Sequence, residues 1–393
     1  MNASHKTLEY LSSLSKLLIE GSRSKTDTGV NLYTPDGVSS YNALWLRDFS
    51  YMVEYAGKFI PEKDIIDCIN YAISGKRDDG WMPDRIYGDG TAVYAAGERG
   101  KPIGQANLDN TPFLVFTVYS LFSRMPREDF HPIFREWEPV LNKGLKIIPL
   151  DENGLVFNIN ETPHSPYGFT DTVAKTGVLF MESLLFWRAC RFMYELDNIF
   201  GGSETDWYSE HFKKIENSID VLSDPVSGMY FAASDACRQL DIWGNAYMLY
   251  IDFPCTQEKK QSILHFLARN YSQYVYKGQI RHLLKGEYWE RLLIGINSEE
   301  YQNGAYWATA SGWIIWCLAQ IDITLACKTL SEVVQYFKIE GPFECVNGDY
   351  KKLPSFVVSA TNVYGGLLHL MESDNYNFIA IYNNYVQEEE IYI

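Results

Sequence analysis

Apolar residues recur at helical spacing in segment after segment of this 393-residue chain. Side chains three and four positions apart share one face of a helix, so the pattern predicts helices that each bury one face. The Thr-Pro pair at 111–112 marks a further helix start, because Thr caps a helix and Pro suits its first position. We predict an amphipathic helix at the N-terminus and helices over 64–74, 175–196, 206–222, 243–251, 257–271, 308–320, 323–336 and 361–371, with another from 111 through 120.

Strand signals are few and short, and they fall near Val30, Gly154 and Gly228. Helices separated by loops at a spacing of roughly 30 residues are typical of stacked hairpins, which close into a ring or extend as a solenoid. A solenoid keeps its connections short, whereas the loops here are long and carry Trp, Asp, Asn and Gly. No linker interrupts the pattern, so we predict a single domain over 1–393.

Composition and charge limit the partners of the chain. A hydrophobic content of 46% allows a large core, and no uncharged apolar run approaches the length of about 20 residues that spans a bilayer. The N-terminus lacks the apolar segment of a secretory signal, so we expect a soluble cytoplasmic protein, or a secreted or periplasmic one if a signal was removed. A net charge of −16 opposes binding to nucleic acid and to anionic lipid.

The cysteines and aromatic residues indicate which cofactors and ligands to expect. Seven cysteines without a C-x-x-C pair predict reduced core thiols, and the sequence shows no metal-ligand spacing and no nucleotide-binding loop. We therefore expect no metal and no cofactor. Ten Trp and 28 Tyr favour a carbohydrate ligand, because sugar rings stack their C–H faces on aromatic rings. We expect a monomer or a weak homodimer.

Six clusters of polar and aromatic residues lie just before predicted helices, where a ring of helices gathers its inner N-termini. In the first cluster, Trp45, Arg47 and Asp48 end the run YNALWLRD. In a pocket, Arg47 and Asp48 would hydrogen-bond sugar hydroxyls with charge-assisted strength. Alternatively, Asp48 caps a helix that begins near Phe49, and Arg47 lies on the surface.

The second cluster places Trp81 and Asp109 before the helix that starts at Thr111. Trp81 is a candidate platform for stacking a sugar ring. Asp109 is either a ligand for sugar hydroxyls or an ordinary loop residue near a helix N-terminus, where a negative charge is favourable.

The third and fourth clusters hold candidate acids. Asp171 stands in the aromatic setting SPYGFTDTVAKTG, which would raise its carboxyl pKa by desolvation, as a general acid requires. The alternative is a helix cap at Asp171 or Thr172, and Glu161 is a competing acid. Asp241 precedes Trp243 at another predicted helix start, where Asp241 would position a sugar or act chemically in place of Asp171. Trp243 is a further candidate for binding the sugar.

The last two clusters complete the candidate site. Residues 301–307 read YQNGAYW and combine amides with aromatic rings, as a saccharide subsite does, or their amides satisfy loop backbone. The substrate-binding candidates of this fifth cluster are Gln302, Asn303, Tyr306 and Trp307. In the sixth cluster, Glu344 lies among apolar neighbours in a turn-rich stretch, which suits a general base that holds a water molecule, although a surface glutamate is the ordinary alternative.

The segments LWLRD, YGFTDTVAKTG, YQNGAYWATASGW and SATNVYGGL, in this order, resemble the six-hairpin glycosidase superfamily, particularly its uncharacterised bacterial and fungal members. The resemblance extends over residues 41–370. It implies an all-α (α/α)6 barrel with a few short β-hairpins in the loops, and mostly hydrolysis with inversion. In the glucoamylase branch a similar Arg-Asp pair holds the terminal sugar, which corresponds to Arg47 and Asp48.

By position in the chain, the resemblance implies Asp171 as the general acid and Glu344 as the general base. The glucoamylase acid is a glutamate, so Glu161 and Asp241 stay open as acids. The predicted function is an inverting glycoside hydrolase. The alternatives are a sugar epimerase or lyase that uses His or Tyr, with His282 a better candidate than His164, a glycoside phosphorylase, or a non-catalytic sugar-binding protein.

Overall fold

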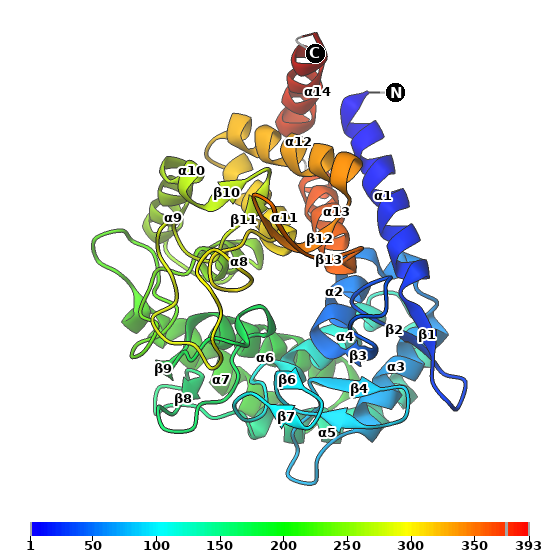
Figure 1. Ribbon diagram of the computed structural model, residues 1–393. Coiled ribbons are helices and arrows are strands. Elements are labelled where there is room, and N and C mark those ends of the chain that lie inside the picture. Colours follow the sequence, from blue (N-terminus) through cyan, green and yellow to red (C-terminus); the bar gives the residue numbers. More distant parts are fainter. Residues whose placement is uncertain (1, 374–375, 392–393) are drawn as a thin grey trace.

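Six helices surround the centre of the molecule, and each contacts the next around a closed ring (Figure 1). The computed structural model describes residues 2–373 and 376–391. Contacts between the last and the first of these helices close the ring. The inner helices are α2 (Leu46–Ala56), α4 (Asn110–Phe122), α6 (Phe180–Phe200), α8 (Ile242–Tyr250), α11 (Ser311–Ala319) and α13 (Val357–Glu372).

A second layer of helices packs outside this ring. α3 (Glu62–Ser74) and α5 (Arg127–Lys146) pack on α4, α7 (Thr205–Ser218) on α6, α9 (Gln257–Arg269) on α8 and α11, and α12 (Ile323–Glu340) on α11. α1 (Ala3–Gly21) packs on α13, and α14 (Tyr376–Ile391) lies against α1 and α12. The two layers confirm the predicted all-α (α/α)6 barrel.

The two layers differ in how their residues are buried. The inner helix α11 is buried on all sides from Ser311 to Leu318, as expected for a helix enclosed by neighbours. The outer helix α5 buries one stripe, formed by Phe130, Phe134 and Trp137 at spacings of four and three. Buried apolar residues from α1 to α14 form one continuous core cluster.

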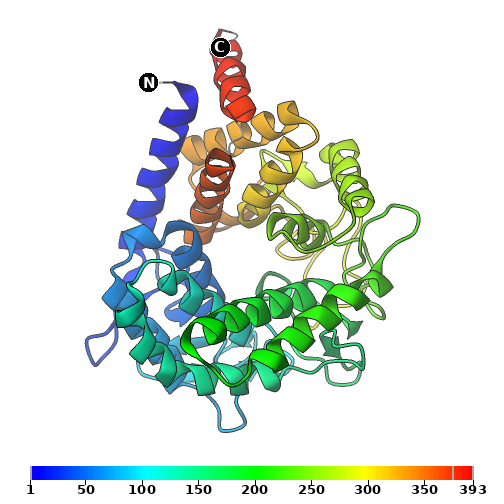
Figure 2. The ribbon, with the colours of Figure 1, turned by 180° about the vertical axis from the view of Figure 1, so that it is seen from behind.

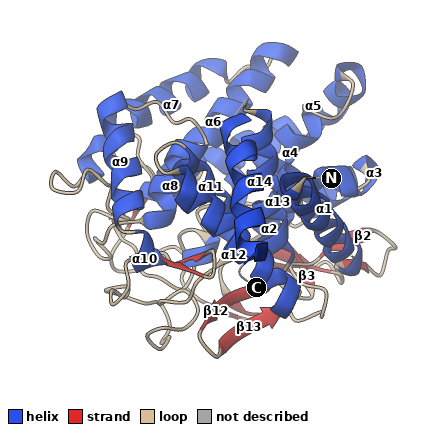
Figure 3. Ribbon diagram, turned by 90° about the horizontal axis from the view of Figure 1, so that it is seen from above, coloured by secondary structure: helices blue, strands red, loops and turns tan. Residues whose placement is uncertain are grey.

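Long and short connections between helices alternate along the chain. As a result, the long connections gather on one side of the helical body, where the candidate site lies. Short links over 57–61, 123–126, 201–204, 251–256 and 320–322 lead from inner to outer helices. Long segments over 75–109, 147–179, 223–241, 275–310 and 341–356 lead into the next inner helices. Figure 3 shows loops and strands gathered along one side of the helical body, and Figure 2 shows the opposite, mainly helical face.

The strands are short antiparallel pairs within these connections. β3 (Ala43–Trp45), β4 (Arg85–Tyr87) and β5 (Ala92–Val93) form one three-stranded sheet, in which Trp45 pairs with Arg85. The predicted hairpins in the loops are confirmed. The two-stranded pairs are β1 (Arg23–Lys25) with β2 (Asn31–Tyr33), β6 (Gly97–Glu98) with β7 (Lys101–Pro102), β8 (Phe157–Asn158) with β9 (Gly177–Val178), β10 (Val275–Tyr276) with β11 (Gln279–Ile280), and β12 (Phe343–Asn347) with β13 (Tyr350–Pro354).

Several predicted boundaries are wrong. The helix expected over 175–196 begins at Phe180, because Gly177 takes a left-handed φ of 78° and pairs with β8 instead. The helix expected near Phe49 begins at Leu46, and the one expected at 361 begins at Val357. Near Gly228 the chain forms only isolated bridges instead of a strand.

The structure also bears on the predictions for the cysteines and for membrane-spanning segments. All seven cysteines are free, and six of them are buried, as predicted for core thiols. Within residues 2–373 and 376–391, no helix is both long enough and apolar enough to cross a membrane. The single-domain organisation stays a prediction.

Candidate active site

A cavity of about 730 Å³ lies among the long loops, and this size is typical of small-molecule sites. Residues from the start of α2, from strands β3, β4, β6 and β12, and from the loop before α6 line it. Aromatic and acidic side chains converge on the same space. The aromatic lining residues are Tyr41, Trp45, Tyr87, Phe169, Tyr301 and Phe356, and the acidic ones are Asp48, Glu98, Asp171 and Glu344.

Asp171 directly follows the short 3-10 helix Gly168–Thr170 and lines the cavity. Its carboxyl is buried, and burial raises the pKa of Asp171 to about 7, although Arg47 opposes the rise. The Nε2 atom of Gln302 donates a 2.8 Å hydrogen bond to Oδ1 of Asp171. The hydroxyl of Ser165 donates to the Asp171 carbonyl oxygen at 2.8 Å, which fixes the backbone as well.

Glu344 lies on β12 and reaches the cavity from another part of the loop layer. The hydroxyl of Tyr41 donates a 2.9 Å hydrogen bond to Oε1, whereas Oε2 is buried without a hydrogen-bond partner among the described residues. The Lys352 ammonium lies 3.8 Å from Oε2. Burial raises the pKa of Glu344, while Lys352 and Tyr41 both act to lower it. Oε2 is therefore a buried acceptor that faces a cation.

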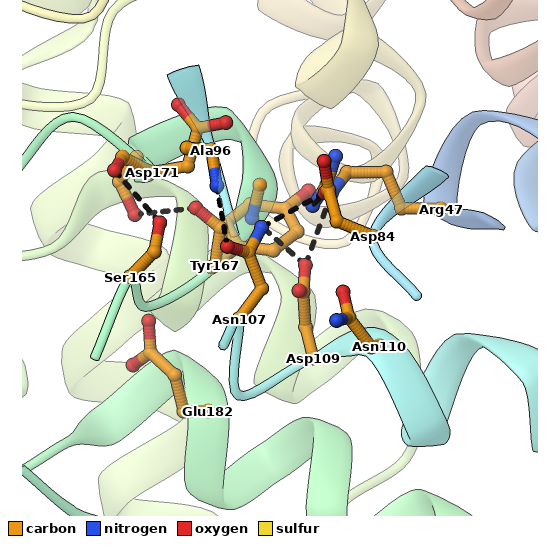
Figure 4. Close-up of polar contacts among 12 residues, drawn as sticks. Arg47, Asp84, Ala96, Asn107, Asp109, Asn110, Ser165, Tyr167, Asp171 and Glu182 are labelled. Carbon is orange, nitrogen blue, oxygen red and sulfur yellow. Dashed lines mark hydrogen bonds and ion pairs between the residues drawn. The ribbon is translucent and has the colours of Figure 1, made fainter. Parts of the chain in front are cut away.

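Arg47 forms the centre of a buried ion cluster near Asp171 (Figure 4). Its Nε atom donates to Oδ2 of Asp109 at 3.1 Å, and its Nη2 atom pairs with Asp84. Asp109 also accepts a 2.8 Å hydrogen bond from the backbone N–H of Gly168. A Cβ atom at Gly168 would overlap the Arg47 guanidinium, so a glycine is needed for this close approach.

The Asp84 carboxylate extends the cluster toward β6. It accepts from Nδ2 of Asn107 at 3.0 Å and pairs with Arg85 at 2.7 Å. Asn107 in turn accepts from the backbone N–H of Ala96, a lining residue, at 2.9 Å (Figure 4). One network thus fixes both Arg47 and the segment that covers the cavity.

Asp48 and Trp45 also line the cavity. Burial raises the pKa of Asp48 to about 8, and the negative charge of Glu344 adds to the rise. Asp48 is therefore largely neutral at pH 7 and can donate a hydrogen bond. The Arg85 guanidinium covers one ring face of Trp45, with 4.4 Å from Cζ to the ring centroid.

The other predicted acids lie elsewhere. Asp241 caps α8 by accepting from the N–H of Gly244 at 2.8 Å, and burial raises the pKa of Asp241 to about 6. Glu161 is exposed on a loop. Neither residue lines the cavity, whereas Asp171 does.

The remaining predicted sugar ligands lie behind the cavity lining. Asp109 holds Arg47, and Gln302 holds Asp171. Asn303 accepts from the N–H of Trp289 at 3.0 Å and so satisfies loop backbone. The four aromatic candidates are buried and absent from the lining: Trp81, Trp243, Tyr306 and Trp307.

The two histidines considered from sequence also lie outside the cavity lining. His164 packs against Trp81 with 5.0 Å between ring centroids, and His282 stacks on Trp243 at 3.9 Å. Burial lowers the pKa of His282 well below its usual range. In the part of the chain that the structure describes, no group of three or more His, Cys, Asp or Glu residues is placed to hold a metal ion.

Sequence reasoning missed four residues that shape the site: Tyr41, Asp84, Tyr301 and Lys352. Tyr41, Asp84 and Tyr301 stand inside clusters that the sequence does single out, but nothing in the local pattern marks them as functional. Lys352 carries no sequence signal, because only the register of the β12–β13 hairpin brings it to Glu344.

Comparison with solved structures shows the same fold. The GH63 mannosylglycerate hydrolase from Thermus thermophilus in complex with glucose superposes with a TM-score of 0.66 at 15% identity, covering 90% of this chain and 99% of that one. A rhamnosidase from Klebsiella oxytoca with rhamnose bound gives 0.63 at 14% identity, covering 94% and 64%. A GH78 rhamnosidase of a Bacillus species gives 0.60 at 12% identity, covering 94% and 35%.

The likeness to these glycosidases confirms the predicted (α/α)6 fold. No protein-family model matches the sequence, and no curated protein matches it.

Proposed function

We propose that this protein is an inverting glycoside hydrolase, with Asp171 as general acid and Glu344 as general base. The observation that carries the proposal is that two buried carboxyls in different environments line one cavity. Cleavage by inversion needs one acid that is protonated near neutral pH and one carboxylate that activates water. The printed names of the structural neighbours, a mannosylglycerate hydrolase and rhamnosidases, support a carbohydrate substrate.

Asp171 has the properties of the acid. A carboxyl with a pKa of about 7 is half protonated at neutral pH, close to the optimum for proton transfer. In the proposed step, Asp171 gives its proton to the glycosidic oxygen as the bond to the anomeric carbon breaks. Gln302 fixes the carboxyl from behind, so the proton is presented toward the cavity.

Glu344 has the properties of the base. Tyr41 occupies Oε1, and Oε2 has no hydrogen-bond donor among the described residues, so we assign to Oε2 the contact with the attacking water. The water oxygen attacks the anomeric carbon from the face opposite the leaving group, and its proton passes to Oε2. The products are the released alcohol and a sugar with inverted anomeric configuration.

The cavity lining disfavours the rival enzymes. Among the described lining residues there is no histidine, and burial raises the pKa of Tyr41 and Tyr301 well above the usual range, which opposes a role as proton acceptors. A phosphorylase needs a phosphate at the position of the base, and the carboxylate of Glu344 would repel that anion.

The test is hydrolysis of a panel of aryl α- and β-glycosides and oligosaccharides by wild type, Asp171→Asn and Glu344→Gln. General acid and base groups each contribute about 10²–10⁴-fold, so both variants should lose at least 100-fold in kcat and still bind sugar. Glu340→Gln, at an outer ion pair with Lys351, is the control and should keep full activity. Near-normal turnover in both active-site variants would overturn the assignment.

A further inference from the structure

The β12–β13 hairpin brings a lysine next to the proposed base. Cys345 on β12 pairs with Lys352 on β13, and Glu344 directly precedes Cys345 in the chain. The lysine therefore lies beside Glu344. The Lys352 ammonium lies 3.8 Å from Oε2 of Glu344 and 3.2 Å from the ring centroid of Tyr301. The half-exposed lysine side chain is thereby held by a ring face and a carboxylate together.

The remaining groups around Glu344 are neutral or negative. Tyr41 donates to Oε1, and the neighbouring Tyr301 hydroxyl also lowers the pKa of Glu344. The negative charge of Asp36 raises that pKa. Burial opposes the charged form of Glu344 as well. Lys352 supplies a positive charge that opposes these effects.

We propose that Lys352 is a positioning residue that keeps Glu344 ionised and directs its Oε2 atom toward the attacking water. A carboxylate buried beside other acids would otherwise retain its proton and could not act as a base. The ammonium lies beyond ordinary hydrogen-bond length from Oε2, so it stabilises the charge without itself being a hydrogen-bond donor to that oxygen. This inference rests on the proposed function.

The next residue in the chain provides a matched control. Lys351 lies on the same strand, and successive strand residues point to opposite faces. Its ammonium pairs with Glu340 at 2.6 Å, at a similar exposure to that of Lys352. A substitution at Lys351 therefore removes the same charge from the same hairpin without touching Glu344.

The first experiment compares the pH dependence of kcat/KM for wild type, Lys352→Met, Lys352→Arg and Lys351→Met. The acidic limb reports the base in the free enzyme. Loss of the nearby cation should move that limb of Lys352→Met upward by about 0.5–1 pH unit. This shift is smaller than that for a fully buried ion pair, because solvent screens the partly exposed lysine. Lys352→Arg and Lys351→Met should stay near wild type. An unmoved limb in Lys352→Met, or an equal shift in Lys351→Met, would overturn the inference.

The second experiment needs no substrate. Carboxyl ¹³C NMR of glutamate-labelled protein gives the pKa of Glu344 directly, with its signal identified by its loss in Glu344→Gln. The pKa should rise in Lys352→Met and not in Lys351→Met, and an unchanged value would overturn the inference. If wild type hydrolyses no glycoside, the proposed function fails, while this titration still decides whether Lys352 controls Glu344.

Discussion

Gln302 donates a hydrogen bond of 2.8 Å from Nε2 to Oδ1 of Asp171, across 131 residues of sequence. The amide itself has no freedom to turn, because its Oε1 atom accepts from the backbone N–H and the hydroxyl of Thr172 at 2.9 and 2.6 Å. The proposed acid is thus oriented by a residue that does not line the cavity. Gln302 acts through Asp171 rather than as a sugar ligand in this account.

Replacing Gln302 should therefore change catalysis through the acid. Gln302→Met removes a donor that stabilises the ionised carboxyl, so the pKa of Asp171 should rise and the basic limb of the pH profile should move upward from about 7. We expect kcat to fall by about 10-fold as the carboxyl loses its fixed orientation. Profiles of kcat and of kcat/KM measure both effects.

A matched control for this change is Gln320→Met, since Gln320 follows α11 at the end away from the loops. Its profile should superimpose on that of wild type. A Gln302→Met enzyme with weakened substrate binding, unchanged kcat and an unshifted basic limb would instead make Gln302 a sugar ligand.

The raised pKa of Asp171 also predicts an effect on stability. Its ordinary value is 3.8 and its folded value is about 7, so the folded state holds the proton more tightly. The favourable contribution of the protonated form is complete below about pH 4 and is lost as the pH rises toward 7. Asp171→Asn should therefore stabilise the protein at pH 8, by on the order of 1–3 kcal/mol.

Thermal unfolding between pH 4 and pH 8 tests this stability effect. The gain in Tm of Asp171→Asn over wild type should grow between about pH 4 and 7 and stay constant above that range. Asp349→Asn, in the exposed turn between β12 and β13, should show no such trend. A gain that is independent of pH would show that desolvation of the Asp171 charge is not its cause.

The ion cluster at Arg47 should matter far more for folding than an exposed pair does. Arg47→Met leaves Asp84 and Asp109 buried without their shared cation, and breaking a buried pair in this way costs about 3–5 kcal/mol. Arg99→Met removes an exposed pair with Asp89, and such pairs contribute about 1 kcal/mol or less.

Urea unfolding of the Arg47→Met and Arg99→Met variants measures the difference. The midpoint of Arg47→Met should fall well below that of Arg99→Met. Equal midpoints would mean that Asp84 and Asp109 become protonated or hydrated in Arg47→Met with little loss in the free energy of unfolding.

Helical periodicity was sufficient to predict the helices, because each outer helix must bury a single stripe, whereas the (α/α)6 barrel was predicted from the resemblance to the six-hairpin glycosidase superfamily. α12 begins at the predicted Ile323, where Asp322 caps it by accepting from two backbone N–H groups. The start of α6 was missed because the predicted helix was carried back over residues 175–179, although Gly177 disfavours a helix and pairs with β8 together with Val178. Propensity alone does not reveal such tertiary pairing.

The sequence was less informative about the site. Position before a helix was enough to single out Asp171, Glu344, Trp45 and the Arg47–Asp48 pair, and all five line the cavity. It could not separate sugar ligands from the residues that support them, because both kinds are amides, aromatic rings and acids in the same loops. Their roles depend on which loop packs on which, and that information is absent from local pattern.

The most direct test of the central claim is the configuration of the sugar at the moment of its release. Wild-type protein is mixed with a glycoside that it cleaves, and proton NMR follows the first anomer to appear before mutarotation. The account predicts the anomer opposite to that of the substrate, because water held by Glu344 attacks as Asp171 protonates the leaving oxygen. Release of the anomer with the configuration of the substrate would contradict the account.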